Sequence, residues 1–283
     1  MKRFVCVTLS LVLLLFMLSG CFLRSADGIR DVRIYADTPA WSLAQAVNSQ
    51  NTRKIARIAK NTPEILNCQD PEYGATLLFW AVGMEKYKSA EALLKAGADP
   101  DIISTYYGAT ALYIAASYSF VDSQAKKDPK YVKLLLEYGA DPDIGFAGMP
   151  DRKTIYDIGS TPLMQSIGCG IEKTKALVEA GADINAKTEN SQRTAAVEAL
   201  SWGGMNLLPE FKKYAYYLIV EKKADITQPY YRTINLPADN PEDQFFPVDL
   251  LRDWNCKVGT EEYEWKIAII EEFARQGVEY RYK

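Results

Sequence analysis

A short phrase that recurs at a fixed interval constrains the fold of this chain more than any other feature. Its copies are Ala96-Gly97-Ala98-Asp99, Tyr138-Gly139-Ala140-Asp141, Ala180-Gly181-Ala182-Asp183 and the altered Lys222-Lys223-Ala224-Asp225. Successive copies lie 42 residues apart. Such a period indicates an array of stacked units, because one short unit cannot bury its apolar face alone.

A second phrase, Gly-x-Thr followed by an apolar run, recurs in step with the first. Its threonines are Thr76, Thr110, Thr161 and, in a degenerate copy, Thr194. Threonine is a favourable N-cap, and glycine just past a helix end adopts the left-handed backbone without steric cost. Two apolar segments lie between these signals. Each unit is therefore predicted to be a helix, a turn, a second helix and an extended loop.

The two phrases resemble the ankyrin repeat, whose pattern runs Gly-x-Thr-Pro-Leu-His at one end and Gly-Ala-Asp at the other. The resemblance covers roughly residues 40–280. It implies an all-α ankyrin-repeat solenoid of stacked helix-turn-helix pairs with hairpin loops. The chain departs from the pattern where the family has histidine, since Phe79, Tyr113, Met164 and Val197 stand there. Lys223 also replaces the glycine, which we expect to cost about 1–2 kcal/mol if the turn stays left-handed.

The start of the chain resembles a bacterial lipoprotein signal peptide. Lys2 and Arg3 precede an apolar run, and Leu18-Ser19-Gly20-Cys21 follows the lipobox pattern, in which the cysteine is lipidated. An ordinary signal peptide or an uncleaved anchor is the alternative. Phe22 stands where aspartate marks inner-membrane retention in enterobacterial lipoproteins. The resemblance therefore implies an outer-membrane lipoprotein that faces the periplasm.

Three parts are predicted: a signal peptide over residues 1–20, the lipidated Cys21 with a tether over 21–38, and a repeat domain over 39–283. Within the tether, residues 32–35 are open to a second interpretation, as a strand docked on the repeats. The repeat domain starts with a cap, a helix pair over residues 40–60. Its second helix carries a basic stripe, Arg53, Lys54, Arg57 and Lys60. A polar outer face suits a terminal unit, and a binding role for the stripe is the alternative.

Composition excludes several kinds of chemistry. The chain has no histidine, which removes Ser-His-Asp and Cys-His arrangements and histidine metal sites. No motif for a cofactor or a phosphate is present, so we predict that the protein is not an enzyme and has no cofactor. The formal net charge is −3, and a mildly acidic chain has no general attraction to nucleic acid. Outside the leader and Cys21, Cys68, Cys169 and Cys256 lie in different units, and no disulfide is expected.

The spacing of the units reveals a larger module. The threonine positions 76, 110, 161 and 194, continued by Phe246, are separated by 34, 51, 33 and 52 residues. Short and long units alternate, which indicates duplication of a two-unit module about 85 residues long. About five repeats follow the cap. The second and fourth each carry about eight extra residues between the helices and nine or ten in the following loop.

The long loops and one helix position supply the candidate binding residues. Aromatic residues are rare in disordered linkers, so we interpret both long loops as ordered and interacting, the alternative being that they pack on their own repeat. Bulky residues also recur eight positions after each threonine-equivalent, as Met84, Tyr118, Cys169, Trp202 and Trp254, a pattern that indicates a contact ridge unless the insertions bury it. The candidate partner-binding residues are Tyr106, Tyr107, Tyr118, Phe146, Arg152, Tyr156, Trp202, Tyr230, Tyr231, Arg232, Phe245 and Trp254.

The combined resemblances imply a lipid-anchored scaffold that binds a protein partner and is otherwise a monomer. Lipoproteins of this build resemble immunity proteins that neutralise phospholipase effectors of the type VI secretion system. A structural adaptor that organises envelope proteins is the second hypothesis, and a module that binds glycan or peptidoglycan is the third.

Overall fold

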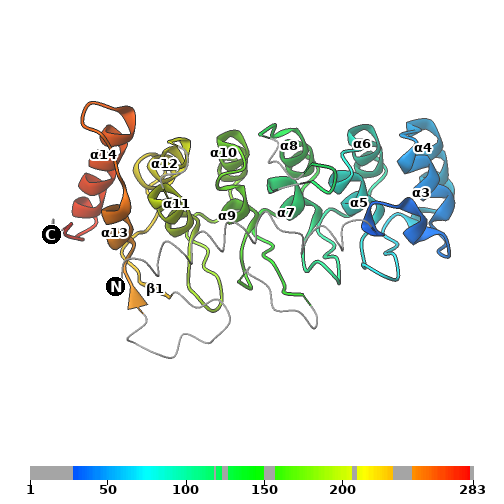
Figure 1. Ribbon diagram of the computed structural model, residues 1–283. Helices are drawn as coiled ribbons and strands as arrows, with labels where there is room; N and C mark the ends of the chain where they lie inside the picture. Colours follow the sequence, from blue (N-terminus) through cyan, green and yellow to red (C-terminus); the bar gives the residue numbers. More distant parts are fainter. Residues whose placement is uncertain are drawn as a thin grey trace.

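The helices form pairs that stand side by side in a single row (Figure 1). The computed structural model describes residues 28–117, 119–122, 127–149, 157–205, 209–231 and 244–280. The cap pairs α3 (Trp41–Asn48) with α4 (Thr52–Asn61), and a short 3-10 helix, η2 (Pro63–Ile65), follows. One hydrophobic core runs through the row. The predicted all-α solenoid is confirmed.

Five helix pairs follow the cap. In chain order, they are α5 (Leu77–Gly83) with α6 (Tyr87–Lys95), α7 (Ala111–Ala116) with α8 (Lys130–Glu137), α9 (Pro162–Ser166) with α10 (Ile171–Glu179), α11 (Ala195–Gly204) with α12 (Glu210–Ala215), and α13 (Pro247–Leu250) with α14 (Glu261–Arg275). A 3-10 turn, η5 (Leu251–Asp253), extends α13. Among the described residues, the strands are β1 (Tyr230–Tyr231) and β2 (Gln244–Phe245).

The two recurring phrases build the helix ends as predicted. Each threonine hydroxyl accepts a hydrogen bond from the amide three residues later, and the donors are Phe79, Tyr113, Met164 and Val197. The glycines at 97, 139 and 181 have φ between +84° and +96°, and the alanine after each donates back to a leucine carbonyl five residues earlier, at 3.0–3.1 Å. Lys223 keeps the left-handed turn, with φ +59°.

The aspartates of the first phrase also link neighbouring repeats. Each accepts from the backbone two residues later, and the acceptor–donor pairs are Asp99–Asp101, Asp141–Asp143, Asp183–Asn185 and Asp225–Thr227. The second residue then accepts from the next repeat, with Asp101 bound to the Asp141 amide and Asp143 to the Asp183 amide, at 2.9 and 2.8 Å. A chain of side-chain hydrogen bonds therefore runs along the row through these turns.

The extra residues of the fourth repeat do not form the inter-helix insertion predicted for them. In the second repeat, residues 117–129 separate α7 from α8. In the fourth, α11 is longer and α12 continues into a π-helical turn, η3 (Tyr216–Glu221). Its closing bond joins the Ala224 amide to the Leu218 carbonyl, six residues earlier instead of five. The added residues are absorbed by lengthened helices in the fourth repeat, because a π turn accommodates an extra residue without breaking the helix.

The predicted tether is wrong from residue 28 onward. Ile29 and Tyr35 are completely buried. The indole Nε1 of Trp80 donates to the Ile29 carbonyl at 2.7 Å, and the Tyr35 hydroxyl donates to the Ala75 carbonyl at 2.9 Å. Residues 32–35 form a 3-10 helix, η1 (Val32–Tyr35), and not a strand. This segment covers the first repeat, while Cys21 lies outside the described residues.

Candidate functional site

The extended loops that follow each helix pair form one continuous edge. We call this the loop edge and define it as the described residues of 69–76, 103–109, 144–160, 187–193 and 228–246. Main-chain hydrogen bonds join each loop to the next: Tyr106 to Tyr73, Ala147 to Gly108, Glu189 to Ile158 and Tyr231 to Ser191, at 2.7–3.1 Å. The loops project to the same side of the row (Figure 1). They therefore present one shared surface.

The two long loops start from equivalent bases. In the first, the Phe146 amide donates to the Ser160 carbonyl at 2.8 Å, and the Gly159 amide donates to the Phe146 carbonyl at 2.9 Å. In the second, β1 and β2 pair Tyr230 with Phe245 and Tyr231 with Gln244. Adding the 85-residue module length to Phe146 and Gly159 gives Tyr231 and Gln244. The duplicated module predicted from spacing therefore recurs in the backbone pairing.

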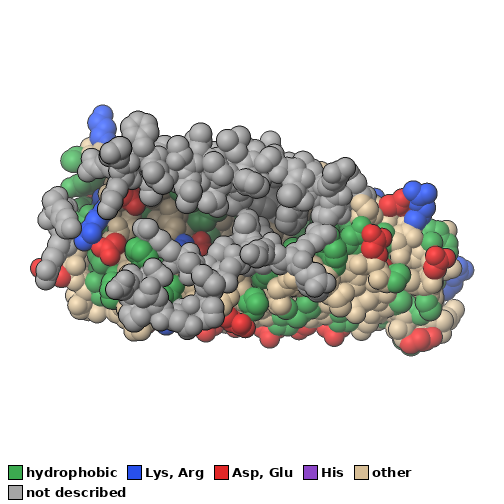
Figure 2. All heavy atoms as spheres, turned by 60° about the horizontal axis from the view of Figure 1, so that its bottom comes forward, with side chains coloured by type: hydrophobic (Ala, Val, Ile, Leu, Met, Phe, Trp, Pro, Cys, Tyr) green, Lys and Arg blue, Asp and Glu red, His purple; other side chains and the backbone are tan. Residues whose placement is uncertain are grey.

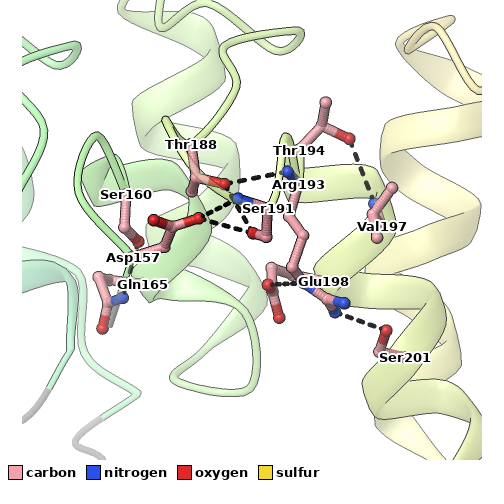
Figure 3. A network of polar contacts seen from close by, with 10 residues as sticks. All are labelled: Asp157, Ser160, Gln165, Thr188, Ser191, Arg193, Thr194, Val197, Glu198 and Ser201. Carbon is pink, nitrogen blue, oxygen red and sulfur yellow. Dashed lines mark hydrogen bonds and ion pairs between the residues drawn. The ribbon is translucent and has the colours of Figure 1, made fainter. Parts of the chain in front are cut away.

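Ser191 ties the two bases together. Its amide and hydroxyl donate to the Asp157 carboxylate at 2.6 and 2.7 Å, beside the base of the first long loop (Figure 3). Its carbonyl accepts from the Tyr231 amide at 2.7 Å, at the start of the second. Asn190 adds a side-chain donor to Asp157 at 2.8 Å. The Ser191 turn therefore fixes the spacing between the two loop bases.

The Asp157 carboxylate at this junction is held ionised. Burial alone would raise its pKa, but the hydrogen bonds from Ser191, Thr188 and Asn190 outweigh that effect and lower the pKa below its ordinary value. Its side chain is 4% exposed. An ionised, nearly buried carboxylate with these donors serves as a structural anchor, because its oxygens are already occupied.

Arg193 fastens the second loop base to helix α11. It forms an ion pair with Glu198 and donates to the Ser201 hydroxyl at 2.7 Å (Figure 3). Its guanidinium carbon lies 5.1 Å from the centre of the Tyr230 ring, within cation–π range. Tyr230 is thereby held between the loop edge and the helices.

Four of the predicted binding residues are buried. Tyr107, Phe146, Tyr230 and Trp254 are between 1% and 4% exposed. The prediction that their rings stand on the surface as contact anchors is wrong. The Tyr107 ring lies 5.6–5.8 Å from the rings of Phe79 and Phe120, and the Phe146 ring stacks on Tyr113. The buried rings of Tyr107 and Phe146 therefore anchor their loops to the adjacent repeats.

Glycines at the ends of two inner helices make room for buried aromatic rings, and Trp254 of the expected ridge is one of these rings, whereas Met84 and Trp202 are partly exposed. A methyl group at Gly203 would come within 2.4 Å of the Trp254 ring, and one at Gly83 within 2.2 Å of the Phe120 ring. The Trp254 indole also donates to the Leu200 carbonyl at 2.9 Å. An aromatic ring from the next repeat therefore fills the space left by the missing side chain. Cys169, another ridge position, is also buried.

Comparisons with known proteins identify the fold. A family model for ankyrin repeats, in three copies, matches residues 43–146. The crystal structure of EF0377, an ankyrin repeat protein, aligns with a TM-score of 0.56 over 84% of this chain and 98% of that chain, at 19% sequence identity. The fold is an ankyrin-repeat solenoid. No curated protein sequence matches the chain significantly.

The accessible aromatic side chains of the ankyrin repeats are fewer than predicted. Tyr106, Trp202, Tyr231 and Phe245 are partly exposed. Tyr118, Arg152, Tyr156 and Arg232 lie outside the described residues. Sequence reasoning missed Phe246, 44% exposed beside β2, and Met205, 50% exposed after α11. Only their hydrophobicity could have indicated them. Figure 2, which turns the loops toward the viewer, shows hydrophobic side chains spread along the described part of this face.

Two kinds of site are absent from the part of the chain that the structure describes. Among the described residues, no group of three or more cysteine, aspartate or glutamate side chains could hold a metal ion, and Cys68, Cys169 and Cys256 form no disulfide. Within the described ranges, no helix combines the length and apolar composition needed to cross a membrane. The polar groups at the loop bases are used to hold the loops. The fold is a scaffold of the kind that mediates protein–protein interaction.

Proposed function

We propose that this protein is a lipid-anchored scaffold that binds and blocks a secreted antibacterial effector, such as a phospholipase, and so acts as an immunity protein. The observation that carries the proposal is the pair of equivalent loop bases fixed side by side by Ser191. Rigid bases hold a binding surface in place and reduce the entropy lost when a partner is bound.

The residues nearest these bases have the chemistry of a protein interface. Tyr231, Phe245 and Phe246 are partly or substantially exposed around β1 and β2. Aromatic side chains carry much of the binding energy in protein interfaces. The lipobox at Cys21 supports placement at a membrane, since acyl chains bind bilayers firmly when more than one is attached. An inhibitor anchored in the membrane would be located at the lipid surface on which a phospholipase acts.

The test uses the protein encoded by the neighbouring gene as the effector. We expect a one-to-one complex, measured by calorimetry, and protection of cells that produce the effector in the periplasm. Cells without the gene should be harmed only when that effector is present. An envelope defect without the effector, together with no binding, would refute immunity and favour the envelope adaptor.

Two substitutions place the interface. Phe246→Ala should weaken effector binding about 30-fold, the equivalent of about 2 kcal/mol for a central anchor. Val258→Ala is the matched control, because Val258 is 74% exposed but lies between α13 and α14, away from the loop edge. Equal affinities for wild type and Phe246→Ala would place the interface elsewhere.

A further inference from the structure

The outer helix of the N-terminal cap carries an unpaired cationic face. On α4, Ile55 and Ala59 are buried, while Arg53, Arg57 and Lys60 are exposed on the opposite face, with Lys54 partly exposed beside them. No carboxylate of the described residues forms an ion pair with any of these four side chains. Within the part of the chain that the structure describes, no acidic side chain therefore balances the cations of this face.

The sequence around α4 differs from the rest of the chain in its lack of acidic residues. Some exposed lysines elsewhere have acidic partners, as Lys95 has Glu91 at 2.6 Å and Lys127 has Glu210 at 2.7 Å. The stretch of residues 38–63 contains the four cations of α4 and no acid, although the chain as a whole has 36 acidic residues and a net charge of −3. Positive charge is thus concentrated at one end of an otherwise acidic molecule.

The cationic face lies on the unit next to the place where the described chain begins. The cap stands at one end of the row, with the first repeat beside it (Figure 1). Ile29 is fixed to the first repeat by Trp80. Cys21 precedes Gly28 by seven residues, which span at most about 25 Å when extended. A membrane anchored at Cys21 would therefore lie close to this end.

We propose that the α4 face, Arg53, Lys54, Arg57 and Lys60, docks on anionic phospholipid headgroups. This inference rests on the lipid anchor of the proposed function and adds a second membrane contact to it. Each Lys or Arg near an anionic leaflet strengthens binding about fivefold. The contact holds the row by its cap and leaves the loop edge of the later repeats free to bind the effector.

The experiment uses residues 21–283 with Cys21→Ser, which lack both the apolar leader and the acylation site. Flotation is measured with vesicles of phosphatidylcholine alone and with vesicles that also contain phosphatidylglycerol. We expect binding only to the phosphatidylglycerol vesicles, and a steep loss of binding as salt is raised from 50 to about 300 mM, because salt screens exposed charges. No binding to anionic vesicles, or equal binding to both kinds, would overturn the proposal.

A charge-matched pair of variants assigns the contact to α4. Replacing Arg53, Lys54, Arg57 and Lys60 with glutamine should reduce vesicle binding at least 50-fold. The control replaces Lys95, Lys127, Lys130 and Lys175 with glutamine, which removes the same charge from exposed, ion-paired positions. It should bind nearly as the parent does. Equal losses in the two variants would show a response to net charge alone and would overturn the assignment.

Effector affinity in solution separates this contact from the proposed immunity. The α4 variant should bind the effector as the parent chain does, since α4 is at the opposite end from the second loop base. If the α4 variant loses effector affinity and vesicle binding is unaffected, the face recognises an acidic part of the protein partner, and the membrane contact is refuted.

Discussion

Trp254 and Trp202 occupy equivalent places in successive repeats but differ in burial, and this difference gives the sharpest test of the structure. Trp254 is 2% exposed, covers Gly203 and donates to the Leu200 carbonyl at 2.9 Å. Trp202 is partly exposed, and its ring meets the Phe211 ring edge-on at 5.4 Å. The two tryptophans should therefore contribute unequally to stability.

The magnitudes follow from these contacts. Replacing a buried tryptophan with alanine costs about 3–5 kcal/mol, and the lost hydrogen bond to Leu200 lies within that range. We therefore expect Trp254→Ala to lower the free energy of unfolding by about 4 kcal/mol. Trp202→Ala should lower it by about 1–2 kcal/mol, because it removes one aromatic contact and only part of a buried surface.

Urea unfolding measures both changes, and hydrogen exchange locates them. Solenoids lose structure locally, so Trp254→Ala should speed amide exchange in α11 and α14 before it affects the cap. Trp254→Phe retains an aromatic ring over Gly203 and should lose only about 1–2 kcal/mol. Equal destabilisation by Trp254→Ala and Trp202→Ala would refute the buried role. So would an intact Trp254→Ala variant that fails only in effector binding.

Three further changes test the junctions between repeats. Asp157→Ala should cost about 2–4 kcal/mol in urea unfolding, because buried donors at the loop bases lose their acceptor; Asp157→Asn, which keeps one oxygen, should cost less. Lys223→Gly should relieve about 1 kcal/mol of backbone strain but remove a 2.8 Å ion pair with Glu272. Burial favours the neutral form of Glu272, but hydrogen bonds, led by the one from Lys223, lower the pKa of its carboxyl group. The ionised Glu272 therefore stabilises the fold above the unfolded pKa of about 4.3, and this stabilisation is lost as pH falls through the lower folded pKa. The melting temperature of the Lys223→Gly variant should fall less than that of wild type between pH 6 and about 3, and an identical pH dependence of the two would contradict the role of the ion pair. Gly83→Ala should lower the free energy of unfolding by about 1–3 kcal/mol, because the added methyl group overpacks against the Phe120 ring. Phe120→Ala in the same chain should recover part of that loss. An unchanged stability of the Gly83→Ala variant would show that the ring has room to move.

The helix pairs could be predicted because both ends of each helix have local chemical requirements. Thr76 caps α5 through a bond that spans three residues, and Gly97 closes α6 with a left-handed backbone. Neither feature depends on distant parts of the chain. The 85-residue module could also be predicted, because the interval between the recurring phrases in the sequence is the same as the interval between the equivalent loop bases. Local signals of this kind identify the solenoid with no knowledge of its surface.

Burial of the aromatic residues could not be predicted because it depends on distant partners. Trp254 is buried since Gly203, some fifty residues earlier, leaves a space for its ring. Ile29 and Tyr35 have charged neighbours in sequence, which made their segment look solvated, yet both are fixed by contacts with the first repeat. Lys223 breaks the recurring phrase for a similar reason, because its partner Glu272 belongs to the last helix. Each of these features depends on a contact between residues that are far apart in the sequence.

The same reasoning explains why the two copies of the module present different surfaces. Phe146 and Tyr231 are equivalent by the 85-residue shift, yet Phe146 is buried and Tyr231 is partly exposed. Phe146 stacks on the ring of Tyr113, whereas the fourth repeat has the smaller Val197 at that threonine-relative position. Tyr231 also keeps its hydroxyl at the surface, where it accepts from the side-chain amide of Gln244 at 3.2 Å. One base is therefore built into the core and the other offers an aromatic side chain to solvent, so the two copies of the module contribute unequal surfaces to the loop edge.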